Sequence, residues 1–296
     1  ESGSAIINGP VSIKGAITLS GSGSIRNGTV SQESPTYKCS GGGGIEKNGS
    51  ISCSNKPSPA NVTKPSVTVS VPVLEDPFAS VLNAPSGPTG SCTTITASSS
   101  KTETLAMTSG GYYCDLSIGG SGKITIPPGE YWVNSFSATG NSTVTMDGVE
   151  LYITGINTSK PSKTVDPAFK VGGSAKVSMI GSMIYIKTGG FDASGSAGMT
   201  KWSAPSSGDY KGLALFMDRG NTATVNQNGS SELKAQSGTW YAPASACTFN
   251  GSTSTIIYSQ FICDTVSVVG SSTLKIKYDS TLVYDPGSSP MISLME

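Results

Sequence analysis

The chain has 296 residues, a formal net charge of zero and only 13% charged residues. This composition disfavours nucleic-acid binding, which needs clustered Lys and Arg to neutralise phosphates, and no stretch approaches the ~20 apolar residues of a membrane-spanning helix. Histidine is absent, which removes Ser-His-Asp and Cys-His catalysis and most catalytic zinc sites. We therefore expect no cofactor, no metal site, no nucleic-acid partner and no membrane span.

The first part of the chain alternates short apolar pairs with tight corners. Dipeptides such as Asn8-Gly9 and Asn27-Gly28 are strong turn signals, because both residues tolerate positive φ. We expect N-terminal β coils over residues 1–30. Residues 31–103 are rich in Pro, Gly and Ser, and we expect an excursion from the coils with one alternating strand at 66–73 and a helical turn at 78–82.

The periodic pattern returns over residues 104–285, which we assign to the main β structure. Two or three short strands recur in roughly 20–25 residues, the size of one solenoid coil. The expected strands include 116–118, 123–126, 143–146, 150–153, 169–171, 183–186, 213–217, 223–225, 232–234, 255–262 and, as the last one, 281–284. A tail at 286–296 follows.

The apolar runs distinguish between two all-β architectures. A β-sandwich or jelly roll also contains many short strands, and it remains the alternative. Runs such as 183–186 and 213–217 are almost continuously apolar, which suits strands buried in a coil interior. The sequence therefore favours a right-handed parallel β-helix, a solenoid with loop excursions.

Six cysteines form three sequence-local pairs, and no Cys-x-x-Cys motif is present. Six cysteines allow fifteen connectivities. Pairing between sequence neighbours bridges adjacent coils or closes one loop, so we predict three disulfides in an oxidising compartment. We expect a secreted or cell-surface protein. The predicted bonds are Cys39–Cys53, Cys92–Cys114 and Cys247–Cys263.

Carboxylates and aromatic pairs are the remaining candidates for chemistry. The acids near expected strands are Glu130, Asp147, Glu150, Asp209, Asp218 and Asp264. Glycosidases place two carboxyl groups ~5–9.5 Å apart, which the pairs Asp209/Asp218 and Asp147/Glu150 could satisfy, although we expect these acids to cap turns or to be solvated. In Tyr112-Tyr113, Tyr131-Trp132 and Trp240-Tyr241 we expect one ring inside the coil and its neighbour outside, with sugar stacking as the alternative.

Several segments resemble one bacterial family in the same order along the chain. Residues 204–219 resemble the "APTSGPYAGILFFQDR" signature of TadG-like, Flp-pilus-associated secreted proteins. Residues 73–79 resemble "PDPLA", 126–131 "L-x-PG-x-Y", 238–243 "G-x-LYFP" and 263–270 "ADTLSISG". The resemblance covers roughly 73–285 and implies a secreted, pilus-associated β-helix.

Taken together, these patterns predict a non-catalytic extracellular structural subunit of a surface appendage or fibre that self-assembles and adheres. Solenoid ends expose unpaired backbone groups, so we expect end-to-end association into an oligomer or filament, with a glycan or cell-surface partner. The expected assembly residues are Ile6, Ile7, Met291, Ile292 and Leu294. The alternative is a polysaccharide-active β-helix enzyme, either a hydrolase or a lyase, using clustered carboxylates.

Overall fold

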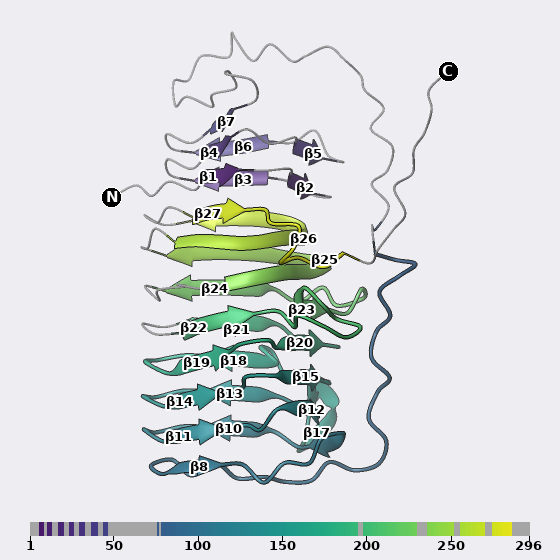
Figure 1. Cartoon of the computed structure of the whole chain (residues 1–296), viewed down its shortest axis with the longest axis vertical. Helices are drawn as coiled ribbons and strands as arrows, with labels where there is room; N and C mark the ends of the chain where they lie inside the picture. The colour runs from purple at the N-terminus through teal and green to yellow at the C-terminus, as the bar shows by residue number, and fades with distance from the viewer. Residues whose placement is uncertain are drawn as a thin grey trace.

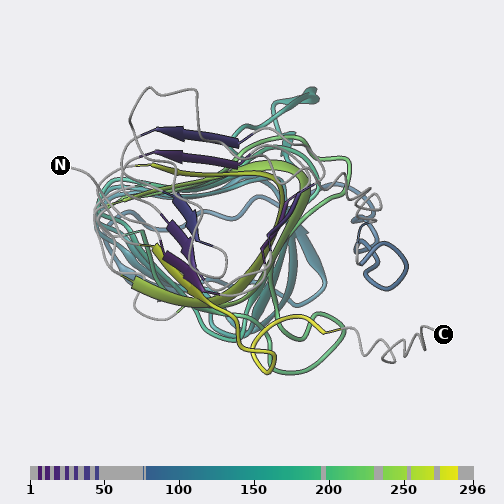
Figure 2. The same cartoon turned by 90° about the horizontal axis from the view of Figure 1, so that it is seen from above.

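The computed structural model describes Asp76 and residues 78–194, 198–229, 236–251, 255–269 and 274–285, together with the backbone of short strands between residues 6 and 46. These residues form strands and turns, with no helix among them. The large parallel sheet curls 302° round one axis, and its coils stack along that axis (Figure 1). The chain is therefore the predicted right-handed parallel β-helix and not a β-sandwich, and Figure 2 shows the coil end-on.

The described strands stack in three parallel columns, which we call faces A, B and C. Face A contains β8 (Thr102–Thr104), β11 (Lys123–Thr125), β14 (Thr143–Thr145), β19 (Lys176–Met179) and β22 (Gly198–Ser203). Face B contains β9 (Gly111–Tyr113), β12 (Gly129–Val133), β15 (Val149–Ile153), β20 (Met183–Ile186) and β23 (Leu213–Met217). Face C contains β10 (Leu116–Ile118), β13 (Phe136–Ala138), β18 (Phe169–Val171), β21 (Phe191–Ala193) and β24 (Val225–Gly229).

Two long strands continue the coil. β25 (Gln236–Gly251) and β26 (Thr255–Val269) each pass through all three faces, and β27 (Leu274–Lys277) extends face A. A small antiparallel hairpin, β16 (Ile156–Asn157) and β17 (Lys160–Thr164), projects between β15 and β18. The described excursions lie beside face B or at its corners, whereas faces A and C stay uncovered by them (Figures 1 and 2).

The N-terminal strands stack on the C-terminal coil of the same chain. In register, β1 pairs with both β27 and β4, and β3 pairs with both β26 and β6. From Asp76 the chain then runs back along the side of face B to β8, and we call residues 76–91 the strap (Figure 1). These N-terminal strands are β1 (Ile6–Asn8), β2 (Val11–Ile13), β3 (Ile17–Ser20), β4 (Ser24–Arg26), β5 (Val30–Gln32), β6 (Tyr37–Ser40) and β7 (Gly44–Glu46).

The coil interior is filled by apolar side chains stacked from one coil to the next. Phe136, Phe169 and Phe191 occupy successive register positions on face C. Their ring centroids are 4.9 and 5.0 Å apart with nearly parallel planes. Each inward-facing side chain packs against the side chain at the same register position of the neighbouring coil. The inward-facing residues of successive strands therefore form one continuous core.

The corners explain the abundance of Gly and of small polar residues. Gly120, Gly140 and Gly173 have φ of about +70° at the same corner, and a Cβ on Gly140 would lie 2.7 Å from the carbonyl oxygen of Gly120. Only glycine fits this close stacking without strain. At another corner the buried Ser182 hydroxyl donates to the Met146 carbonyl and accepts from the Val149 N–H, which satisfies backbone groups that the ladder leaves unpaired.

Some element boundaries differ from the prediction. The N-terminal strands continue to Glu46, well past the expected boundary at residue 30, while the expected strands 66–73 and 232–234 and the tail 286–296 lie outside the described residues. The main coil starts at Thr102 and its last strand ends at Lys277. The strand expected at 281–284 is wrong: this segment is a turn, because the Asp279 carboxylate accepts from the backbone N–H and hydroxyl of Thr281.

The helical turn expected at 78–82 is confirmed as a single turn. The backbone N–H groups of Val81 and Leu82 both donate to the Phe78 carbonyl, at 3.1 and 2.9 Å. The Asp76 carboxylate accepts from the Phe78 N–H at 3.0 Å, as an N-terminal cap does. This turn directs Phe78 and Leu82 toward face B, where both are buried.

Candidate functional site

Face B carries a ladder of outward-facing aromatic residues, one from each successive coil. Parallel register aligns each residue with the next, from β9 to β25. We call this set the outer ladder. Its members are Tyr112, Trp132, Tyr152, Tyr185, Phe216 and Tyr241.

The rings of the outer ladder contact each other and are largely withdrawn from solvent. Trp132 and Tyr152 have centroids 5.1 Å apart, and Tyr185 and Phe216 have centroids 5.0 Å apart. Exposure falls from 8% at Trp132 to 0% at Phe216. Since the ladder lies outside the coil, this burial must come from other parts of the chain.

The strap and two loops supply the cover. Phe78 packs on Tyr241 and on Tyr284, with centroid distances of 5.6 and 4.9 Å. Tyr210, from the loop before β23, packs on Tyr152 at 6.5 Å. Together with the ladder, these residues form a second hydrophobic cluster, separate from the coil interior.

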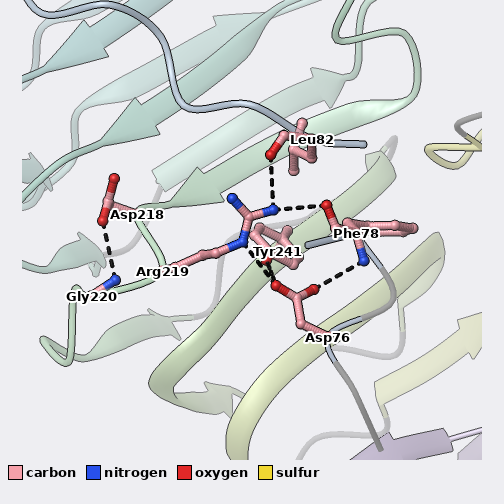
Figure 3. A network of polar contacts seen from close by, with 7 residues as sticks. All are labelled: Asp76, Phe78, Leu82, Asp218, Arg219, Gly220 and Tyr241. Carbon is pink, nitrogen blue, oxygen red and sulfur yellow. Dashed lines mark hydrogen bonds and ion pairs between the residues drawn. The ribbon is translucent and has the colours of Figure 1, made fainter. Parts of the chain in front are cut away.

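Arg219 fastens the strap to the coil (Figure 3). Its Nε donates to Asp76 Oδ2 at 2.8 Å, and its Nη2 donates to the carbonyl oxygens of Phe78 and Leu82, also at 2.8 Å. The hydroxyl of Tyr241 donates to the same Asp76 oxygen, and the guanidinium lies 5.5 Å from the centre of the Tyr241 ring. We call Asp76, Arg219 and Tyr241 the clasp.

The clasp shifts the protonation equilibria of its members. Burial by itself raises the pKa of Asp76, but hydrogen bonds from Tyr241, Arg219 and the Phe78 N–H outweigh burial and hold that pKa below its usual range. Burial and the hydrogen bond to Asp76 raise the pKa of Tyr241. Asp76 therefore stays ionised and Arg219 stays charged at neutral pH, so the ion pair holds through the physiological range.

An acidic group lies further along face B. Glu130 and Glu150 are paired in register on adjacent strands, and the Tyr152 hydroxyl donates to Glu150. Burial raises the pKa of Glu150, the Tyr152 hydrogen bond opposes this rise, and repulsion from Glu130 and Asp209 adds to it. Burial and the charges of Glu150 and Asp209 also raise the pKa of Tyr210, to about 12. Such an environment suits a carboxyl that holds a proton more tightly than usual.

The other candidate acids have different surroundings. Asp147 accepts from the Ser178 hydroxyl and the Ile180 N–H, and Asp218 accepts from the Tyr185 hydroxyl and the Gly220 N–H. Both therefore stabilise turns, as expected. Asp264 lies half-buried on β26. The group that the structure brings together, Glu130 with Glu150 and Asp209, is neither of the two pairs suggested by sequence spacing.

The aromatic pairs divide between the two clusters as predicted. Tyr113, Tyr131 and Trp240 belong to the coil interior, and their neighbours Tyr112, Trp132 and Tyr241 belong to the outer ladder. Sequence reasoning missed Tyr152 and Tyr185 as ladder members, because each is a single aromatic within an apolar strand. It also missed the clasp, since 143 positions separate Asp76 from Arg219.

Two of the three predicted disulfides are confirmed. Cys92–Cys114 and Cys247–Cys263 are bonded, with Cα–Cα distances of 5.0 and 6.1 Å. Cys92–Cys114 ties the end of the strap to the coil next to β9. Cys53 lies outside the described residues, so Cys39–Cys53 stays a prediction.

The predicted assembly residues fall at both ends of the sequence. Ile6 and Ile7 lie on β1, whose backbone pairs with β27 on one side and β4 on the other. In this arrangement a second chain cannot add a strand to β1. Met291, Ile292 and Leu294 lie outside the described residues, and self-association stays a prediction.

Two searches of the described residues give negative findings. Among them, no three Cys, Asp or Glu side chains gather closely enough to hold a metal ion. Within the same part of the chain, no helix has the length and apolar character to span a membrane. Comparison with protein-family models, curated proteins and solved structures finds no match to this chain.

Proposed function

We propose that this protein is a non-catalytic extracellular β-helix that serves as a structural shaft in a self-assembling surface appendage or fibre, with adhesion as an additional role. The resemblance to TadG-like, pilus-associated proteins supports this proposal. The continuous core supports it too, because a stacked solenoid with cross-linked coils is stiff along its axis. The two disulfides fit an oxidising location outside the cell.

The observation that carries the proposal is the fastening of the strap over face B. Aromatic side chains on an open β-helix face would suit sugar stacking. Here the ladder is covered by Phe78, Tyr210 and Tyr284, and the clasp uses its charges within the chain. The aromatic and charged side chains on this part of face B thus brace the coil.

Negative-stain imaging and light scattering of the full chain test the assembly. We expect concentration-dependent filaments or oligomers, and loss of association when residues 286–296 are deleted. A separate deletion of residues 2–9 removes β1, which pairs within the chain, and is expected to affect stability more than association. A stable monomer at high concentration would contradict assembly.

A second candidate function, a glycoside hydrolase, is favoured by one observation. Register places the Cα atoms of Glu130 and Glu150 ~4.8 Å apart on adjacent strands, which is compatible with the ~5 Å carboxyl separation of retaining enzymes. Glu150, with its raised pKa, would be the acid. A polysaccharide panel assayed with and without calcium tests this. Turnover abolished by Glu150→Gln and by Glu130→Gln, but not by Asp147→Asn, would replace the shaft proposal.

A further inference from the structure

Face A presents two columns of outward side chains on a sheet that none of the described excursions covers. In the first column Thr102, Lys123, Thr143 and Lys176 follow one another in register. In the second column Thr104, Thr125, Thr145, Ser178 and Lys201 do the same. The side chains of these residues end in hydroxyl or ammonium groups, and the residues between the two columns point inward. The first column ends at Gly198, which pairs with Lys176.

The charged residues within these two columns are all lysines. Lys123, Lys176 and Lys201 are exposed, and the described residues contain no ion-pair partner for any of them. Two carboxylates lie near this face. Glu103 occupies an inward register position and accepts from the Ser98 N–H, and Asp147 is held at the corner by Ser178 and Ile180.

Face C provides the contrast. Its exposed lysine, Lys170, lies directly opposite Asp192 on the neighbouring strand, and serine occupies the same outward column at Ser117 and Ser137. Pairing a lysine with an aspartate across two strands offsets the positive charge at that point of the surface. On face A, Lys123 is in register with two threonines, Lys176 with Thr143 and Gly198, and Lys201 with Ser178. None of these pairings sets a carboxylate directly opposite a lysine.

The spacing on face A is regular in two directions. Adjacent parallel strands lie ~4.8 Å apart, so Lys123 and Lys176, two coils apart, are separated by about 10 Å. Along one strand, consecutive outward-facing residues (i and i+2) are ~6.6 Å apart. The two columns thus present hydroxyl groups with single positive charges at regular intervals, on strands that stack along the coil axis.

We propose that face A binds an extended acidic polysaccharide, with the chain of sugars lying along the coil axis. Lysine ammonium groups attract the carboxylates as point charges, and threonine and serine hydroxyls can donate to and accept from sugar hydroxyls. A nucleic acid fits less well. A duplex requires a denser basic patch, and a single strand requires stacking aromatics, which the outward columns lack. This inference does not depend on the shaft proposal, since a monomer would carry the same face.

Binding of polygalacturonate by the full chain tests the proposal, with dextran as the neutral polymer and duplex DNA as the other polyanion. We expect polygalacturonate to bind at about 0.1 M salt and to be released near 1 M, because exposed charges are screened. The variant Lys123→Gln/Lys176→Gln/Lys201→Gln should lose about tenfold in affinity. Circular dichroism confirms that each variant keeps its strand content.

The matched control removes the same number of charges elsewhere. Lys160→Gln/Lys163→Gln/Lys170→Gln alters the β16–β17 hairpin and face C, and should stay within about twofold of the wild-type affinity. A second variant, Thr125→Val/Thr145→Val, keeps shape and charge but removes two hydroxyls, and should weaken polygalacturonate binding without changing any residual binding of DNA.

Three results would overturn the inference. The first is no polygalacturonate binding at low salt, and the second is an equal loss of affinity in the control variant. The third is DNA binding as tight as polygalacturonate binding together with no effect of the threonine variant, which would make face A a non-selective cationic surface.

Discussion

Replacing Arg219 with Gln should release the strap without unfolding the coil. Arg219 donates three hydrogen bonds of 2.8 Å, all to the strap. Phe78 and Leu82 remain as apolar anchors, at 6% and 2% exposure. The coil beneath keeps its own ladder of backbone hydrogen bonds, so the effect should be local.

The magnitude follows from these contacts. Hydrogen bonds to a charged group contribute ~1.5–3 kcal/mol each when buried. The side chains of Arg219 and Asp76 are 34% and 21% exposed, so we take ~1 kcal/mol for each of the three bonds. The free energy of strap opening should fall by about 3 kcal/mol, which is roughly a 100-fold increase in the open population.

Limited proteolysis and hydrogen exchange measure this opening. Cleavage within residues 79–91, and exchange of the Val81 and Leu82 amides that bond to Phe78, should both accelerate in Arg219→Gln. Lys211→Gln, an exposed charge in the loop before β23, is the control and should change neither. If Arg219→Gln lowered the melting temperature but left strap cleavage unchanged, the effect would not be local to the strap. If neither quantity changed, Arg219 would not hold the strap at all.

The clasp also predicts a pH dependence of strap opening. The pKa of Asp76 is lower in the folded chain than its ordinary value of 3.8. The stabilisation from its carboxylate is therefore complete above pH 3.8 and is lost as the pH falls through the folded value. Cleavage of the strap by an acid-active protease should rise in that window, and Asp76→Asn should abolish the pH dependence.

Three further predictions concern stability. The pKa of Glu150 in the folded chain is raised above 4.5, so the ionised carboxylate destabilises the fold above the folded pKa. The variant Glu150→Gln should therefore raise the melting temperature at neutral pH and leave it unchanged below about pH 4.5. An equal rise in melting temperature at both pH values would contradict this sign. Replacing Cys92 and Cys114 by Ala opens a link with a sequence separation of 22 residues and should cost ~3 kcal/mol in denaturant unfolding, whereas an unchanged midpoint would refute a stabilising role. Gly212→Ala places a Cβ 2.3 Å from the Val283 carbonyl at a φ of +78°, so cleavage at 278–285 should accelerate, and unaltered cleavage would show that this contact does not hold the segment.

The sequence by itself determined the architecture. Short strands ended by turn residues at coil-sized intervals predict a solenoid, because each strand needs a neighbouring coil to bury its inward face. The two confirmed disulfides followed from the same reasoning, since cysteines on adjacent coils can lie side by side. The division of Tyr131 from Trp132, and of Trp240 from Tyr241, followed from strand alternation.

Tertiary structure alone decided where distant segments meet. Nothing local in the sequence places β1 on β27, because any strand of suitable length can pair with an exposed coil edge. The same holds for the clasp, where Asp76 and Arg219 belong to segments that each look like ordinary turns. The group formed by Glu150 and Asp209 depends on how a loop folds over face B, and the alignment of lysines with hydroxyl residues on face A depends on register between strands. These features come from coil stacking, which aligns residues at intervals set by loop lengths rather than by a fixed period in the sequence.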